Sequence, residues 1–280
     1  RKMSTVTSDA EATALSEKKW TRHDSLWVLG IYGCAVSSGS LFWPISLGLA
    51  GLWPMFILTL LAFPVTYLTY RVYSGFIMEA PDINGREGNI IDAVEHYFGR
   101  SWAKWITLFY FITVFPGMMV YTITITNTLI DFMHNQLGMP EFSRIVVAPV
   151  SVLGLLLLVQ GSTTVIVKVM GCIVFPFILS LVFFGIMAIP YWNTAFMHSS
   201  SDPVGLAENA ASLWVSLPMV IYAFSFTSVV SSFVVAQRQK YRSNALAKVR
   251  QVMFIAVALI ILTVCFFSWS CIIALSPAEI

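Results

Sequence analysis

A glycine- and serine-rich stretch interrupts the first long apolar segment of the chain. It reads Gly33-Cys34-Ala35-Val36-Ser37-Ser38-Gly39-Ser40, and apolar residues resume at Leu41. Hydrocarbon offers no partner to a free backbone N–H or C=O, so a helix is left open at membrane depth only where protein, water or a ligand fills the gap. The stretch therefore predicts an interrupted membrane-spanning helix with a binding site at the interruption.

The two sides of this interruption have complementary chemistry. The amides around Gly39 begin the second half-helix, with the positive end of its dipole behind them, and suit a carboxylate. The carbonyls near Ala35 and Val36 end the first half-helix and suit an ammonium group or a cation. A zwitterionic amino acid satisfies both ends, whereas the alternative is a small-residue face for close helix packing. The candidate substrate-binding residues in this stretch are Ala35, Val36, Ser37, Ser38, Gly39 and Ser40.

A second disturbed segment lies in the sixth apolar span. Phe224 and Phe226 flank Ser225, and Thr227 follows directly. The aromatic rings could close over a small ligand while the hydroxyl groups contact its side chain. The alternative is ordinary aromatic packing, with hydroxyls bonded back to their own helix. We take all four residues as further candidate substrate-binding residues.

These segments must be carried by membrane helices, because 58% of the 280 residues are apolar and only 11% are charged. Soluble domains average roughly 25% charged residues. Residues 1–20 read as a flexible polar tail, and residues 21–280 as an all-α polytopic membrane helix bundle. The predicted spans are Leu26 to Leu49, Trp53 to Phe76, Trp105 to Ile130, Ile145 to Val159, Val165 to Ile189, Leu213 to Val235 and Val252 to Leu275.

The basic residues set the predicted orientation. All of the 16 Lys and Arg residues except Arg144 fall on one side of these spans. The positive-inside rule places that side, with the N-terminus, in the cytoplasm. The formal net charge of +2 gives no indication of nucleic-acid binding. A short amphipathic helix over residues 89–99 is expected along the inner face, as an intracellular gate or as a packing element at the membrane surface.

Several motifs together resemble the serine/threonine permease branch of the hydroxy and aromatic amino acid permease family, which has the LeuT-like fold. They include Leu29-Gly30-Ile31-Tyr32-Gly33, Leu41-Phe42-Trp43-Pro44-Ile45, His96-Tyr97-Phe98-Gly99, Val174-Phe175-Pro176-Phe177, Ile189-Pro190-Tyr191-Trp192-Asn193 and Phe224-Ser225-Phe226. The resemblance implies an inverted-repeat architecture with interrupted first and sixth helices. It also implies a bacterial inner-membrane symporter of L-serine or L-threonine, with no cofactor and with a proton rather than sodium as the coupling ion. The oligomeric state stays open.

The chain departs from the family pattern in three places. Ser37-Ser38-Gly39 stands where a Gly-Ala-Gly-like break is usual, and the interval after Phe226 is shorter and lacks Pro and His. Relatives also continue through further spans beyond Ile280. The second repeat is therefore expected to be incomplete, with the chain an N-terminal part of a transporter.

Lys168 is the candidate for ion coupling. No Asp, Glu or His lies deep in any predicted span, which removes the usual proton carriers. In some LeuT-like relatives a fifth-span lysine stands in for sodium, and a partly desolvated lysine has a lowered pKa. The alternative is a lysine that extends to the inner surface as an anchor.

Other classes of protein fit less well. A non-transporting amino acid sensor on the same fold stays open as the alternative function. A seven-helix receptor would reverse the charge bias, and a retinal protein would need a lysine in the last span, where there is none. An enzyme is not expected, because the spans contain no nucleophile–base pair and no metal-ligand cluster.

Overall fold

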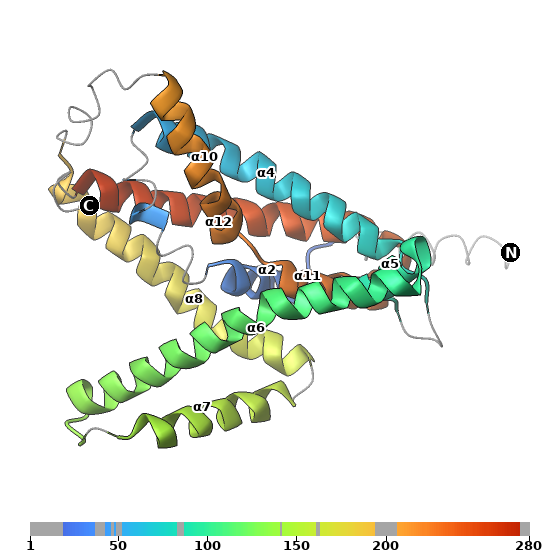
Figure 1. The fold of residues 1–280 in the computed structure, drawn as a ribbon, viewed down its shortest axis with the longest axis horizontal. Helices are drawn as coiled ribbons and strands as arrows, with labels where there is room; N and C mark the ends of the chain where they lie inside the picture. Colours follow the sequence, from blue (N-terminus) through green and yellow to red (C-terminus); the bar gives the residue numbers. More distant parts are fainter. Residues whose placement is uncertain are drawn as a thin grey trace, which may run out of the picture. The chain divides into compact units, whose positions relative to one another are not determined.

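A computed structural model describes residues 19–36, 43–45, 48, 52–82, 87–140, 142–160, 163–193 and 206–274. These residues form helices joined by short turns, and no strand occurs among them. The chain is an all-α polytopic membrane protein, as its composition predicts. It divides into two units, residues 1–89 with 170–280, and residues 90–169, which are described separately below (Figure 1).

Four stretches of the described residues are long and apolar enough to cross a membrane. They are Trp53–Met78, Arg100–Gln136, Lys168–Tyr191 and Thr227–Ala274, the last of which contains more than one helix. Two shorter apolar helices cover Arg144–Leu157 and Ala210–Ala223. These six stretches overlap the second to the seventh of the predicted spans.

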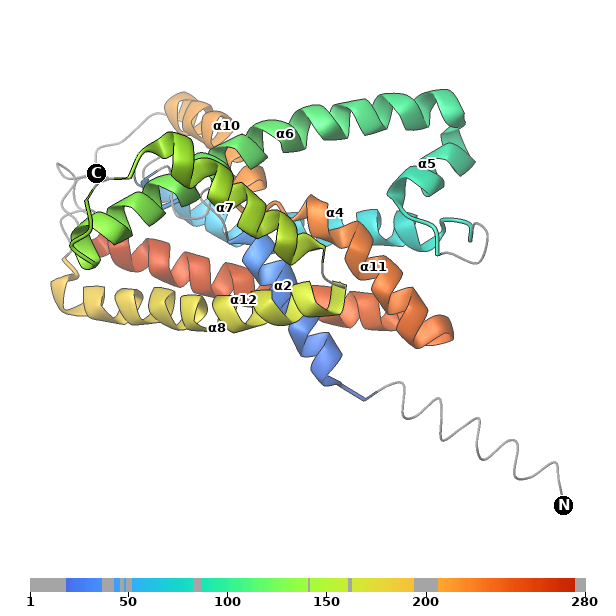
Figure 2. The same ribbon diagram turned by 90° about the horizontal axis from the view of Figure 1, so that it is seen from below.

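The first unit is built around α12 (Ala245–Ala274), which packs against α2 (Arg22–Ala35), α4 (Leu52–Met78) and α11 (Thr227–Tyr241). Figures 1 and 2 show α12 extending along the length of this unit. Its buried face supplies much of the core, with Val257, Ile260 and Val264 almost completely excluded from solvent. Tyr32 of α2 bonds to Thr263 of α12 through their hydroxyls at 2.8 Å.

Helices α2 and α12 begin, and helices α4 and α11 end, at the same end of this unit. The starts of α2 and α12 meet through Asp24 and Lys248, whose Oδ2 and Nζ atoms lie 3.2 Å apart. The ends of α4 and α11 lie at the same end of the unit, where Arg238 binds the segment after α4. We call this end the charged end, defined by Asp24, Asp82, Glu87, Arg238, Tyr241 and Lys248.

The helical path of the predicted sixth span is interrupted. Helix α10 (Leu206–Ala223) ends before Phe224, and α11 starts at Thr227, so Phe224, Ser225 and Phe226 form a non-helical link (Figure 1). Pro218 lies inside α10, one and a half turns before the link. A proline removes one backbone donor from the helix and weakens the turn before it.

The second unit is a helical hairpin with a short helix at its start. Helix α5 (Ile90–Phe98) meets α6 (Arg100–Asp131) at Gly99, whose φ of +86° suits a residue without a side chain. A short π-helical turn (Phe132–Gln136) leads toward α7 (Arg144–Val159), which packs back on α6. Helix α8 (Thr163–Ala188) begins in this unit and continues in the first, where Asn193 donates its N–H to the Ile273 carbonyl at 3.1 Å.

Gly185 of α8 allows a close approach to α12. A Cβ atom at this position would lie 2.5 Å from Cε1 and 3.0 Å from Cδ1 of Phe266, closer than atoms can pack. We expect Gly185→Ala to lower the stability of the protein by about 1–3 kcal/mol, because the ring must leave its site. Thermal unfolding in detergent measures the loss.

The matched control is Gly75→Ala in α4, where an added Cβ meets nothing within 4 Å. This change should leave the melting temperature unchanged or raise it, because alanine favours a helix over glycine by about 1 kcal/mol. Equal effects of the two substitutions would show that the contact with Phe266 does not limit the approach of the helices.

Candidate functional site at a helix interruption

The interruption between α10 and α11 is held by a tyrosine from α4. The backbone N–H of Phe226 donates to the Tyr70 hydroxyl at 2.7 Å, and that hydroxyl bonds the Thr227 hydroxyl at 3.1 Å. The rings of Tyr70 and Phe226 stack with their centroids 3.7 Å apart. Tyr70 therefore satisfies a backbone donor that the end of the helix leaves without a helical partner.

The other aromatic residue of the link packs in a different direction. Phe224 meets Trp43 edge to face, with centroids 5.2 Å apart, and both side chains are 1% exposed. The indole N–H of Trp43 is buried, and no hydrogen-bond partner for it occurs in the described part of the chain. Ser225, between the two phenylalanines, is exposed. Each phenylalanine thus packs on its own aromatic partner, and the link leaves the small hydroxyl residue between them accessible.

The start of the first candidate segment lies near the same level of the unit. Trp27 of α2 packs on Phe233 of α11 at 5.5 Å, and His23 lies 6.4 Å from the Tyr241 ring, so the two helices are antiparallel. If the same pairing is followed to the end of α2, the last turn of α2 lies at the level of the link. The α-helix ends at Ala35, with Val36 as its C-cap. Residues 37–40, the remaining candidates of the first segment, lie outside the described residues.

Tyr70 was not predicted from the sequence as a site residue. Tyrosines at positions 67, 70 and 73 recur at helical spacing in α4, but this pattern alone does not show which hydroxyl reaches another helix. Tyr67 instead packs its ring on Phe63 and Phe254, at centroid distances of 5.9 and 5.5 Å. Tyr70 is identified as a site residue only by its hydrogen bond to Phe226, which lies 156 positions away in the sequence.

A buried ion pair lies at the charged end. Asp24 is 0% exposed and Lys248 is 2% exposed, and the Tyr241 hydroxyl donates to Asp24 Oδ1 at 2.8 Å. The backbone N–H of Thr21 donates to Asp24 Oδ2 at 2.9 Å. Lys248 also donates to the carbonyl of Lys19 at 2.7 Å. These bonds join the start of α2 to the end of α11 and the start of α12.

The hydrogen bonds to Asp24 determine its protonation. Burial alone would raise the pKa of this carboxyl group, but the bonds from Tyr241, Thr21 and Lys248 outweigh burial and hold the pKa below its usual value. A carboxyl group with a lower pKa in the folded state stabilises the fold above its unfolded pKa, and that contribution is lost as the pH falls through the folded value.

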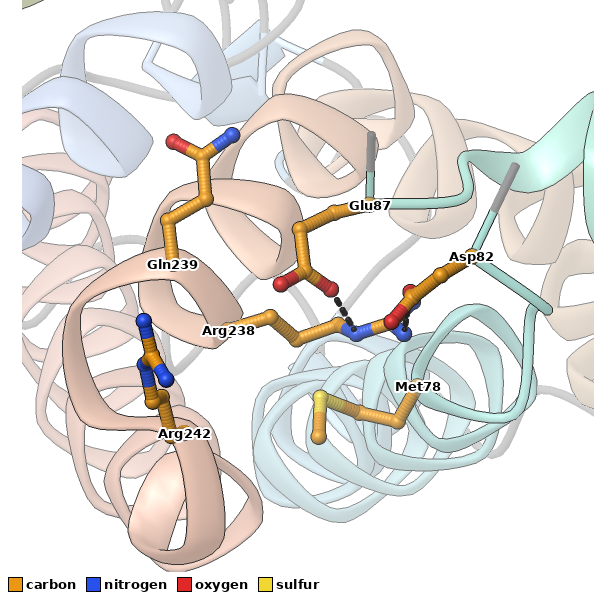
Figure 3. Close-up of a pocket in the computed structure, with 6 residues that line it drawn as sticks. All are labelled: Met78, Asp82, Glu87, Arg238, Gln239 and Arg242. Carbon is orange, nitrogen blue, oxygen red and sulfur yellow. Dashed lines mark hydrogen bonds and ion pairs between the residues drawn. The ribbon is translucent and has the colours of Figure 1, made fainter. Parts of the chain in front are cut away.

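A second ionic cluster fixes the segment that follows α4. Arg238 of α11 bonds to Asp82 Oδ1 at 2.6 Å and to Glu87 Oε2 at 2.8 Å, and it donates to the Ala80 carbonyl at 3.0 Å (Figure 3). These contacts use different N–H groups of the planar guanidinium, which binds two carboxylates and a carbonyl at once. The cluster therefore holds residues 80–82 and 87–88, which follow α4, against α11.

The remaining sequence candidate, Lys168, is exposed and lies in the second turn of α8. Among the described residues it has no ion-pair partner. Its role in ion coupling therefore stays a prediction. Over the same residues, no group of three or more His, Cys, Asp or Glu side chains is placed to hold a metal ion.

Comparison with known proteins identifies the family. Residues 27–272 match the family described as "Transmembrane amino acid transporter protein". The chain belongs to this family. The chain is 35% identical over 281 aligned residues to the serine transporter SdaC of Escherichia coli K12, covering 99% of this chain and 65% of that protein. The resemblance to amino acid permeases that the sequence motifs indicate is thereby confirmed.

Two further relatives carry a related name. The threonine/serine transporter TdcC of Yersinia enterocolitica is 34% identical, with 96% of this chain and 62% of the relative aligned. The protein of the same name from Edwardsiella piscicida is 35% identical, with 93% and 60% aligned. The chain thus spans a little under two thirds of the length of these relatives. No solved structure matches the chain.

The buried pair at the charged end gives a prediction for stability. Asp24→Asn leaves the Lys248 ammonium buried without its counter-charge, and we expect a loss of about 3–5 kcal/mol at pH 7. The difference from the native protein should shrink as the pH falls below about 4, because native Asp24 then loses its own contribution. Thermal unfolding in detergent over this pH range measures both effects.

Two variants serve as controls for this prediction. Asp24→Asn combined with Lys248→Met removes both charges and should recover much of the loss. Asp82→Asn removes a carboxylate whose side chain is 59% exposed, and it should cost less than about 1 kcal/mol. A native-like melting temperature for Asp24→Asn at pH 7 would contradict the importance of the buried pair.

Proposed function

We propose that the complete protein is a secondary transporter that carries small polar amino acids, L-serine and L-threonine foremost, into the bacterial cell by cation symport. Membership of a family of amino acid transporters and the names of the relatives support this function. The observation that carries it is the interruption at Phe224–Phe226, which is braced by Tyr70 from another helix. Interrupted helices are the usual place for substrate in transporters.

The interruption has the chemistry to bind an amino acid. Thr227 and Ser228 are the first residues of α11, and the amides of a first helical turn have no intrahelical acceptor. Together with the helix dipole, they suit the carboxylate of a substrate. The carbonyls that end α2 near Ala35 would take the ammonium group, and the Ser225 and Thr227 hydroxyls would contact the side chain. Ser37 to Ser40 complete this proposed site.

We assign the charged end to the cytoplasmic side of the inner membrane. Basic residues are concentrated there, and the described ones near the junction of α11 and α12 are Arg238, Lys240, Arg242, Lys248 and Arg250. Cytoplasmic segments of membrane proteins carry such an excess. In this orientation the Asp24–Lys248 pair closes the inner side, and it must open before substrate can leave toward the cytoplasm.

We propose the proton, rather than sodium, as the coupling ion. This choice follows from the resemblance to proton-coupled permeases, with Lys168 as the candidate carrier. The position of Lys168 near the start of α8 also suits an anchor at the inner surface. An amino acid sensor that binds without transport is the second candidate function, since the same interruption would serve either role.

Uptake by the reconstituted protein tests this function. We expect proteoliposomes with the complete gene product to accumulate radiolabelled L-serine, with competition from L-threonine and little from large or charged amino acids. An imposed inward proton gradient should raise the initial rate, and sodium should not. Binding of L-serine without any uptake would favour the sensor, and the absence of both would contradict the proposal.

Tyr70→Phe tests whether the tyrosine positions the site. The variant keeps the stacked ring but leaves the buried Phe226 N–H without its acceptor, a loss worth about 1–3 kcal/mol. We expect the KM for L-serine to rise about tenfold or more, because this energy corresponds to such a factor. Uptake kinetics measure KM, and thermal unfolding on the same samples measures the fold.

The control is Tyr67→Phe, one turn away on the same helix, whose ring is the part that packs on Phe63 and Phe254. Its KM should stay at the native value. If Tyr70→Phe lowers the melting temperature without changing the KM, the hydroxyl has a structural role only.

A further inference from the structure

We propose that a cavity at the charged end is a second binding site for an α-amino acid, separate from the helix interruption. The cavity has a volume of about 620 Å³ and is lined by Met78, Asp82, Glu87, Arg238, Gln239 and Arg242 (Figure 3). All six residues belong to the first unit. The volume is within the usual range for small-molecule sites and exceeds what a serine-sized ligand needs, so water would share the space.

Arg238 is already occupied by the protein. Its Nε and Nη2 atoms bind Glu87 and Asp82, and Nη1 donates to the carbonyls of Ala80 and Gly88 at 3.0 and 3.4 Å. Its side chain is only 13% exposed. Arg238 therefore shapes the wall of the cavity and is not available to a ligand.

Arg242 is the available cation. Within the described part of the chain no partner is found for its guanidinium, which borders the cavity on the side away from Asp82 (Figure 3). It follows the last residue of α11 with a φ of +42°, the only positive value among the described non-glycine residues. Glycine would adopt this conformation more easily, so the arginine is kept there against the preference of the backbone. Arg242 is exposed and lines the cavity, so its guanidinium is accessible to a ligand there.

The anionic side of the cavity is also available. Asp82 and Glu87 each contact Arg238 through one oxygen, Oδ1 and Oε2 respectively, so the other oxygen of each carboxylate can accept from a ligand. Two carboxylates and two guanidinium groups give a formal charge of zero. The carboxylates would repel a free anion, and Arg242 would repel a free cation, so binding of a simple ion of either sign is not favoured. A zwitterion can place its carboxylate on Arg242 and its ammonium group near Glu87.

The position of the cavity suggests what a bound amino acid would do. Arg242 follows α11, whereas Asp82 and Glu87 belong to the loop after α4, and Arg238 already joins these two segments. A ligand that bridges them would favour the arrangement in which they are together. Under the proposed function, this end faces the cytoplasm and opens during release. Amino acid that has accumulated inside would then slow further uptake.

Counting binding sites tests this inference separately from the transport function. The complete gene product in nanodiscs is titrated with radiolabelled L-serine, and the bound ligand per protein is measured at saturation. We expect two sites in the native protein and one in Arg242→Gln and Arg242→Gly. The glycine variant relieves the unfavourable φ, so its melting temperature should not fall, and loss of binding cannot be attributed to misfolding.

Three further measurements define the chemistry. Arg242→Lys should keep the second site with about tenfold weaker affinity, because an ammonium lacks the fork of the guanidinium. Arg250 is an exposed arginine of α12 that does not line the cavity, and the variant Arg250→Gln should keep both sites. L-serine methyl ester, which lacks the carboxylate, and L-lactate, which lacks the ammonium group, should fail to displace serine from the site that depends on Arg242.

The outcomes distinguish the two proposals. One site in both the native protein and the Arg242 variants would overturn the cavity site and leave the interruption as the binding site. One site in the native protein and none in the Arg242 variants would support the cavity and contradict binding at the interruption. Displacement by L-lactate as effective as that by L-serine would overturn the zwitterion assignment.

Discussion

The hydrogen bond from the Phe226 N–H to the Tyr70 hydroxyl is the contact on which the candidate site depends. A chain that leaves the helix inside an apolar environment must find partners for its backbone groups, because lipid provides none. Tyr70 provides one from α4, and its ring stacks on Phe226 so that the hydroxyl is held in place. The second predicted span, which contains no break of its own, is thereby part of the site.

The charged end combines strong contacts with an unfavourable one. Asp24, Lys248 and Tyr241 form a buried network in which each polar group has a partner. One turn before Tyr241, the amide of Gln237 is 0% exposed, and neither its oxygen nor its nitrogen has a partner among the described residues. An unsatisfied buried polar group costs about 1–3 kcal/mol. This cost opposes the burial of this part of α11. Under the proposed function, it would ease the movement of that helix during transport.

The sequence predicts the local features well and the distant contacts poorly. Hydropathy locates the helices, and hydroxyl residues among aromatic ones mark the segment at which α10 gives way to α11. Tyr70 and Phe226 are 156 positions apart, and Asp24 and Lys248 are 224 apart. Helical periodicity reports which residues share a face, but it does not report which helices meet. The partners of Tyr70, Asp24 and Arg238 therefore emerge only from the packed structure.

The packing of the two phenylalanines bears on the size of a ligand at the interruption. Phe224 is held by Trp43 and Phe226 by Tyr70, and both rings are 1% exposed, so neither is free to swing over a bulky substrate. Ser225 lies between them with its side chain accessible. Rings that are packed in this way on both sides of a small hydroxyl residue do not move aside easily for a large apolar group. Under the proposed function, a preference for serine over aromatic amino acids agrees with the rigidity of these packed rings, since a well-packed core does not yield to added volume.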